Sequence, residues 1–105
     1  MRRGEIWWAE LPPPSGRRPV LLLSRDEAYS VRSLIVVAPV TTRIRGIASE
    51  VRLGIAEGLP QDCAANLDTI TTIPKDSLQN CLAVLNFKKM KEVEAAVCFA
   101  LGIAK

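Results

Sequence analysis

The 105-residue sequence contains no histidine, which removes the most common general base and the most common metal ligand of proteins together. Its three cysteines, Cys63, Cys81 and Cys98, are odd in number, widely spaced and without a C-x-x-C pair. This pattern indicates neither a disulfide framework nor a zinc site, and it predicts free thiols in the core. Any catalysis must therefore come from other groups, and we expect no metal at the site.

Long apolar runs are also missing. No uninterrupted apolar stretch approaches the roughly 20 residues of a membrane-spanning helix. The first residues, MRRGEIWWAEL, do not resemble a signal peptide, because Glu5 and Glu10 interrupt the apolar region. We expect a cytoplasmic protein with no membrane partner, and the length predicts a single domain over residues 1–105.

Lysine is absent from residues 1–52, which hold all nine arginines and five acidic residues, a net charge of +4. Residues 53–105 hold five lysines and six acidic residues, a net charge of −1. The planar guanidinium fork suits bidentate contact with phosphate, whereas lysine would serve surface solvation equally well. The asymmetry therefore predicts a nucleic-acid partner. The alternative is a set of solvated arginines at strand edges, paired with internal acids.

Strand-forming residues separated by turn signals predict about six short strands in a mainly antiparallel arrangement. The segments at 17–24 and 33–40 are apolar on both faces, as in central strands of a packed sheet or barrel. The polar segment between them is expected to be a loop with one helical turn, and a second single turn is expected around PKDSL. The predicted strands are 5–11, 17–24, 33–40, 48–53, 63–73 and 79–85.

The residues after Asn86, a suitable N-cap, change to a helical period. Apolar residues recur at spacings of three and four and predict one buried helical face, made of Phe87, Met90, Val93, Val97, Ala100 and Leu101. The sequence thus predicts a small barrel that is mainly β, with a C-terminal helix.

Two groups of residues could act on a phosphate. Arg17 and Arg18 open an apolar strand, and Pro19 favours extended backbone at Arg18. Neighbouring side chains point to opposite faces of a strand. We therefore expect the Arg18 side chain to have a defined direction toward one face and the Arg17 side chain to be free.

The second group follows the strand at 33–40, where Thr41 and Thr42 precede Arg43 and Arg45. Hydroxyls beside arginines can hold a phosphate oxygen while the cations neutralise it. Two threonines after a strand are also ordinary turn residues.

Three stretches carry a family resemblance. The opening RRGEIWWAELPPPSGRRPVLLLS, the strand VVAPVTT and the block LPQDCAANLDTITTIPKDSL are similar, in this order and spacing, to the MazF/PemK toxin endoribonucleases. The resemblance covers nearly the whole chain. It implies an SH3-like barrel of the CcdB/PemK type, a homodimer, and cleavage of single-stranded RNA without a metal or cofactor. It also implies a cognate antitoxin with an acidic, partly disordered segment that competes with RNA.

The resemblance also implies roles for individual residues. The arginine before proline, Arg18, and the threonine that closes the next strand, Thr41, match the catalytic pair of the family. The further residues that it places at the RNA, together with those of the two groups above, are Arg17, Ser24, Thr42, Arg43, Asp68 and Thr69.

The sequence departs from the family in two places. The first loop, PPPSGRRP, lacks the acidic residue and extra glycines that often precede R-P, and Thr69 stands where glutamine is frequent. Two alternatives stay open: a gyrase-inhibiting toxin of the same fold, and a nucleic-acid-binding barrel without catalysis. The chain ends ALGIAK, with leucine where the gyrase poisons have tryptophan before Gly-Ile.

Overall fold

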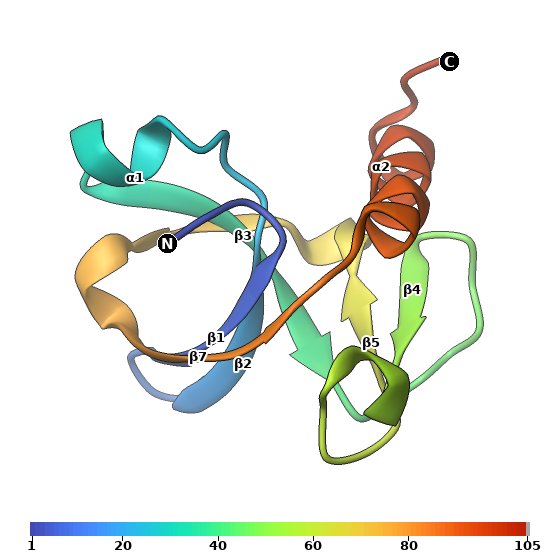
Figure 1. The fold of residues 1–105 in the computed structure, drawn as a ribbon, viewed down its shortest axis with the longest axis horizontal. Coiled ribbons are helices and arrows are strands. Elements are labelled where there is room, and N and C mark those ends of the chain that lie inside the picture. Colours follow the sequence, from blue (N-terminus) through green and yellow to red (C-terminus); the bar gives the residue numbers. More distant parts are fainter. Residues whose placement is uncertain (105) are drawn as a thin grey trace.

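The computed structural model describes residues 1–104, which form a strongly curled sheet with one long helix packed beside it (Figure 1). All strand pairings are antiparallel, as expected. The strands are β1 (Glu5–Glu10), β2 (Arg17–Leu22), β3 (Leu34–Thr41), β4 (Glu50–Leu53), β5 (Cys63–Asn66), β6 (Thr71–Pro74) and β7 (Leu78–Val84). The helices are α1 (Ala28–Val31) and α2 (Phe87–Leu101), with single 3-10 turns η1 (Ile55–Glu57), η2 (Leu67–Thr69) and η3 (Lys75–Ser77).

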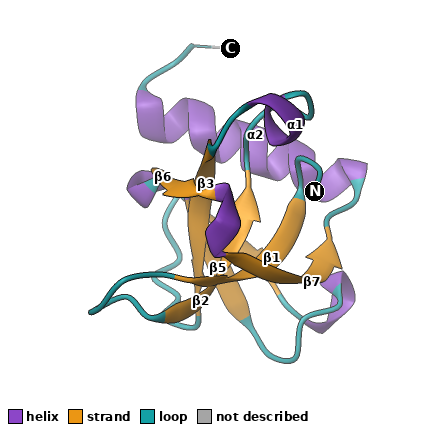
Figure 2. Cartoon of the chain, turned by 90° about the vertical axis from the view of Figure 1, so that its left-hand side faces the viewer, coloured by secondary structure: helices purple, strands orange, loops and turns teal. Residues whose placement is uncertain are grey.

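The sheet curls around β3, its longest strand. The strand order is β4-β5-β3-β2-β1-β7, and β6 pairs with the first half of β3. Ile35 of β3 lies opposite Ile73 of β6, whereas Val40 lies opposite Ala65 of β5. One strand thus serves two partners along the same edge, which gives the half-barrel seen in Figures 1 and 2.

Both faces of the second half of β2 are buried, as its sequence predicts. In β3 the prediction fails for one face of the first half, where Leu34 is 56 % exposed and Val36 is 38 % exposed. In β2, Val20 and Leu21 are at most 2 % exposed although they point to opposite faces. One apolar cluster lies between the sheet and α2, and the other lies on the opposite face near α1. The first includes Ile6, Leu21, Val51, Leu67 and Val93, and the second includes Ala9, Val20, Leu22, Tyr29, Ile35 and Ile73.

The expected strand at 63–73 is in fact two strands, so the prediction of six was one too few. The Asn66 side chain accepts a hydrogen bond from the Asp68 backbone N–H at 2.9 Å, which starts the 3-10 turn η2. A side chain that competes for local backbone donors in this way ends a strand. Residues 71–74 then resume as β6 against a different part of β3.

Helix α2 begins where expected, because the Asn86 side chain accepts from the Lys89 backbone N–H at 2.8 Å. Met90, Val93 and Ala96 are buried, but Phe87 is 77 % exposed and Leu101 is 59 % exposed. The predicted apolar face was therefore wrong at both ends, because the helix meets the core only through its middle turns.

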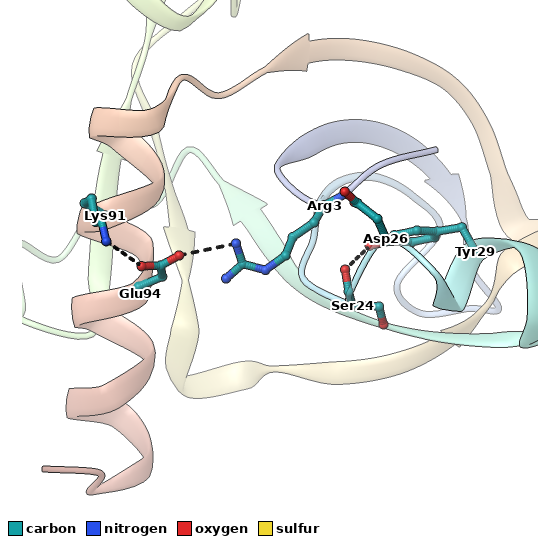
Figure 3. A network of polar contacts seen from close by, with 6 residues as sticks. All are labelled: Arg3, Ser24, Asp26, Tyr29, Lys91 and Glu94. Carbon is teal, nitrogen blue, oxygen red and sulfur yellow. Dashed lines mark hydrogen bonds and ion pairs between the residues drawn. The ribbon is translucent and has the colours of Figure 1, made fainter. Parts of the chain in front are cut away.

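A polar network joins the N-terminal segment to α2 and to the loop after β2 (Figure 3). The Arg3 guanidinium lies 3.4 Å from Glu94, and the Arg3 backbone N–H donates to Asp26 at 2.7 Å. The Tyr29 hydroxyl donates to the Ser24 carbonyl at 3.0 Å. These contacts fix the end of the molecule at which β2 finishes, away from Arg17 and Arg18 at its start.

The cysteines differ from the expectation in one case. Cys63 is buried and Cys98 partly so, but Cys81 is exposed, so the prediction of three core thiols was wrong for Cys81. Within residues 1–104, no helix is both long and apolar enough to cross a membrane.

Candidate nucleic-acid cleft

The pairing of β2 with β3 brings Arg18 and Thr41 together. Val20 lies opposite Pro39, and Leu21 lies opposite Ala38. Arg18 lies two residues before Val20 and Thr41 lies two residues after Pro39, so both stand just beyond the paired part of the two strands, on the face of Val20 and Pro39.

Two neighbouring cavities open at this pair, and Arg18 and Thr41 line both of them. The tryptophan cavity, of about 340 Å³, is lined by Trp8, Ser15, Arg17, Arg18, Pro19, Val40, Thr41, Thr42, Leu59, Pro60, Gln61, Cys63 and Leu82. The glutamate cavity, of about 190 Å³, is lined by Arg18, Pro39, Thr41, Arg43, Arg45, Glu50, Asn66 and Thr69. The pair thus stands between an apolar cavity and a charged one.

Both members of the pair keep hydrogen-bonding capacity for a ligand. The Arg18 Nε–H donates to the Ser15 carbonyl at 2.9 Å, which fixes the side chain and leaves the two terminal NH2 groups of the guanidinium for other acceptors. The Thr41 Oγ1 accepts from the Arg43 backbone N–H at 3.1 Å, so its own proton is available to donate. A guanidinium and a hydroxyl can therefore donate together to the oxygens of one phosphate group.

Arg17 is held rather than free, which corrects the expectation from strand alternation. Its guanidinium carbon lies 4.1 Å from the centroid of the Trp8 ring, and its Nε–H donates to Gln79 at 2.8 Å. The register explains the stacking: Trp8 pairs with Pro19 and Glu10 with Arg17, so Trp8 and Arg17 are diagonal neighbours on one face. The arginine keeps its charge at the rim of the tryptophan cavity.

The segment after β3 contributes to both cavities. Thr42 lines the tryptophan cavity, whereas Arg43 and Arg45 line the glutamate cavity. Among residues 1–104, the arginines that form ion pairs are Arg3 and Arg52. None of the arginines that line the two cavities makes an ion pair within the described residues, so the alternative of internally paired arginines does not hold for them.

Glu50 is the one acidic residue on either cavity within the described chain. Its Oε1 accepts from the backbone N–H groups of Arg45 and Gly46 at 2.9 and 3.0 Å, and its Oε2 is buried without a partner. Gly46 has φ 72°, a left-handed conformation that favours glycine. The carboxylate thus holds the turn that carries Arg43 and Arg45. Our sequence reasoning missed Glu50, because alternation in ASEVRL indicated only a strand with one wet face.

Of three further residues that the resemblance places at RNA, one lies at the cleft and two do not. Thr69 lines the glutamate cavity, and its hydroxyl donates weakly to the Asn66 carbonyl at 3.4 Å. Asp68 lies outside both cavities and accepts from the buried Ser49 hydroxyl at 2.5 Å. Ser24 also lies outside both, beyond the end of β2 opposite to Arg18, and its Oγ accepts from the Val36 N–H at 2.8 Å. Roles for these three at RNA stay predictions.

The fold and the cleft together define a small, curled β protein whose cationic groove suits a phosphodiester. Residues 2–101 match the family described as PemK-like, MazF-like toxin of type II toxin-antitoxin system. The chain therefore belongs to the PemK/MazF toxin family, which confirms the resemblance and the fold class expected from it.

Individual relatives agree. The chain is 43 % identical over 103 residues to the probable endoribonuclease MazF5 of Mycobacterium tuberculosis, covering 97 % of this chain and 90 % of the relative. It is 32 % identical over 111 residues to the endoribonuclease MazF of Staphylococcus saprophyticus, covering 98 % and 92 %.

Solved structures give the same result. The Mycobacterium tuberculosis toxin MazF-mt6 matches with a TM-score of 0.88 and 30 % identity, over 96 % of this chain and 99 % of that one. A mycobacterial endoribonuclease in complex with its cognate antitoxin matches with a TM-score of 0.88 and 27 % identity, over 100 % and 98 %.

Proposed function

We propose that the chain is the toxin of a type II toxin–antitoxin system and an endoribonuclease that cuts single-stranded RNA at the cleft between Arg18 and Thr41. The observation that carries the proposal is the shared position of these two side chains at both cavities. The relatives described above are endoribonucleases or MazF toxins, which favours RNA cleavage over gyrase inhibition and over binding without catalysis.

RNA supplies its own nucleophile in this reaction. The 2′-oxygen attacks the adjacent phosphorus as the bond to the 5′-oxygen breaks, which leaves a 2′,3′-cyclic phosphate and a 5′-hydroxyl. The proton lost from the 2′-hydroxyl balances the proton that the 5′-oxygen takes up. No nucleophile from the protein and no cofactor enters this scheme, which accords with a sequence without histidine.

The protein's contribution is electrostatic. Negative charge builds on the phosphoryl oxygens in the transition state, where the Arg18 guanidinium and the Thr41 hydroxyl would donate to it. Loss of one preorganised donor of this kind costs about 3 to 4 kcal/mol of barrier, or 100- to 1000-fold in rate. A guanidinium is a poor general base, so Arg18 acts first as a clamp for charge.

The same cations suit an acidic antitoxin. A disordered segment rich in carboxylates could fold onto the cleft and exclude RNA, because both ligands are polyanions. We further propose that the toxin acts as a homodimer in the cytoplasm.

Incubation of the purified protein with a long single-stranded RNA in EDTA tests the proposed reaction. We expect discrete fragments with 5′-hydroxyl ends from the wild type, and a loss of at least 100-fold in rate for Arg18→Ala and for Thr41→Val. Arg32→Ala is the matched control, because Arg32 is exposed and lies outside both cavities. Intact RNA with the wild type, or full activity of Arg18→Ala, would contradict the proposal.

A further inference from the structure

The two arginines at the start of β2 are held in the same way. The Arg17 Nε–H donates to the Gln79 side-chain oxygen at 2.8 Å, and the Arg18 Nε–H donates to the Ser15 carbonyl at 2.9 Å. Each contact uses the nitrogen nearest the aliphatic stem, so both terminal NH2 groups of each guanidinium remain for a ligand. Each acceptor is also neutral, so it orients the cation without offsetting its charge.

Arginines elsewhere in the chain are held differently. The terminal Nη1 of Arg3 lies 3.4 Å from the Glu94 carboxylate, and the terminal Nη2 of Arg52 lies 4.0 Å from that of Asp62. A carboxylate in this position occupies a terminal nitrogen and offsets the positive charge. The chain thus treats the arginines of the cleft hairpin differently from those that make structural ion pairs.

A carboxylate lies near Arg17 and is not used. Glu10 is the partner of Arg17 in the ladder between β1 and β2, and Cβ atoms of such partners lie about 5 Å apart. Opposite charges at these positions commonly attract, yet within the described residues the two side chains form no ion pair. The guanidinium turns instead to Gln79 and to the Trp8 ring, whose centroid is 4.1 Å away. The neutral acceptor is therefore taken although a charged one is close.

The loop between β1 and β2 presents its carbonyl from a restricted backbone. Proline occupies positions 12, 13 and 14, and it fixes φ at each of them. The Ser15 N–H donates to the Pro12 carbonyl at 3.1 Å, and the Leu11 N–H donates to the Gly16 carbonyl at 2.9 Å. Gly16, with φ 66°, then turns the chain into β2. The Ser15 carbonyl is therefore in place before any ligand binds.

We propose that the proline loop, residues 12–16, and Gln79 are positioning elements of the cleft. The Ser15 carbonyl orients Arg18, the Gln79 carboxamide orients Arg17, and both leave the positive charge directed at a phosphodiester. Donors that are oriented in advance need no reorganisation when charge develops in the transition state. This inference rests on the proposed endoribonuclease function, which supplies the phosphodiester.

The first experiment gives Arg17 the charged acceptor that the structure omits. Gln79→Glu keeps an oxygen at the same reach and adds a negative charge. The probe is a labelled single-stranded oligonucleotide with one 2′-deoxyribose at the cleaved position, so that the nucleophile is missing, and anisotropy measures Kd over a range of KCl concentrations. We expect Gln79→Glu to weaken binding and to lower the log–log salt slope by about 0.7, the value for one phosphate. Gln79→Ala should weaken Kd by at most about 10-fold and keep the slope, because only the orientation of Arg17 is lost.

Asn80→Glu is the matched control for this change. Asn80 adjoins Gln79 in β7, is exposed and lines neither cavity, so the wild-type slope should remain. In an Arg17→Ala background, Gln79→Glu should have no further effect on Kd. A wild-type slope in Gln79→Glu, an equal loss of affinity in both backgrounds, or an equal loss of slope in Asn80→Glu would overturn the role of Gln79.

The second experiment loosens the proline loop. The double variant Pro13→Gly, Pro14→Gly frees two backbone positions and leaves Arg18 in the chain. We expect kcat to fall about 10- to 100-fold while KM stays within a few-fold, because a misplaced guanidinium loses its contacts in the transition state. Ser30→Gly, Val31→Gly loosens an exposed part of α1 beyond the other end of β2, and it should keep the wild-type kcat. Rates are compared at a temperature at which circular dichroism shows both variants to be folded.

The Nε–H resonances give a readout that does not depend on cleavage. In isotope-labelled protein, the signals of Arg17 and Arg18, assigned with Arg17→Lys and Arg18→Lys, should exchange slowly with water. The loop variant should speed the exchange of Arg18 alone. Unchanged exchange at Arg18, or an unchanged kcat, in the loop variant would overturn the role of the loop. Absence of cleavage by the wild type would overturn the proposed function, whereas cleavage that is insensitive to the loop and to Gln79 would overturn the positioning alone.

Discussion

Replacing Glu50 tests how the cleft keeps its arginines in place. The carboxylate accepts two backbone N–H groups, from Arg45 and Gly46, in the turn between β3 and β4. Glu50→Ala removes both bonds, and Glu50→Gln keeps an oxygen that can accept them without the charge. We expect the alanine variant to loosen the turn and the glutamine variant to preserve it.

The effect on stability should be small. Hydrogen bonds to a charged acceptor contribute about 1.5 to 3 kcal/mol each, at the low end for partly exposed bonds such as these. Burial of the unpartnered Oε2 costs about 1 to 3 kcal/mol, which the alanine variant recovers. The two terms nearly cancel, so a change in Tm of only a few degrees is expected for a chain of this size.

The effect on RNA binding should be larger. On single strands, log Kd changes with log salt by about 0.7 for each phosphate that is neutralised. If the turn presents Arg43 and Arg45 to one phosphate each, Glu50→Ala should lower that slope by about 1.4. Anisotropy of a labelled oligonucleotide with one 2′-deoxyribose, titrated with KCl, measures the slope.

A double-mutant cycle separates this mechanism from general damage to the fold. In an Arg43→Ala, Arg45→Ala background, Glu50→Ala should have no further effect on affinity, because its action passes through those arginines. An equal loss in both backgrounds would refute the reasoning. So would a Glu50→Gln variant that keeps the wild-type salt slope but loses kcat, since the carboxylate would then act on the reaction itself.

Three further results are expected. Burial, followed by the charge of Asp26, raises the pKa of Tyr29 from 10.0 to about 12. The folded state therefore gains about 2 to 3 kcal/mol of stability, which is complete below pH 10 and is lost as the pH rises from 10 to 12. Because Tyr29 is the only tyrosine, tyrosinate absorbance reports it directly, and ionisation near pH 10 in the folded protein would contradict the assignment. Asn86→Ala should lower the unfolding free energy by about 1 kcal/mol in urea denaturation, through loss of the cap of α2, with Asn86→Asp as the control that retains it. Glu94→Ala, which breaks the partly exposed ion pairs with Arg3 and Lys91, should cost less than about 1 kcal/mol for each pair, and a larger loss of unfolding free energy would contradict this expectation.

Local signals in the sequence predict much of this fold. The prolines after Leu11 end β1, the apolar runs place β2 and β3 in the centre, and Asn86 marks the start of α2. The split between β5 and β6 was not predictable from composition, because it depends on which half of β3 each segment meets. The exposed ends of α2 have a similar cause: the 3.6-residue period gives a face, but not how far the underlying sheet extends.

The residues of the site also divide into those that the sequence predicts and those that depend on contacts between separate segments. The resemblance selected Arg18 and Thr41, and both line the same two cavities because they follow the end of the ladder between β2 and β3. Arg17 could not be placed from alternation alone, because its position depends on a diagonal contact with Trp8 from another strand. Glu50 was hidden for a related reason: its partners are backbone N–H groups of a turn, which leave no mark on residue spacing.

The use of the acidic residues explains why the cleft stays cationic. Glu50 accepts from the backbone of the turn, Asp26 from the backbone N–H of Arg3, Glu57 from Gly54, and Asp68 from the Ser49 hydroxyl. Of these carboxylates only Glu50 lies on the cleft, where its single negative charge faces the four arginines that line the two cavities, Arg17, Arg18, Arg43 and Arg45. An arginine cluster with an excess of positive charge attracts an external polyanion, and RNA and an acidic antitoxin segment both meet that requirement. Competition between the two follows directly if one set of unpaired cations serves both.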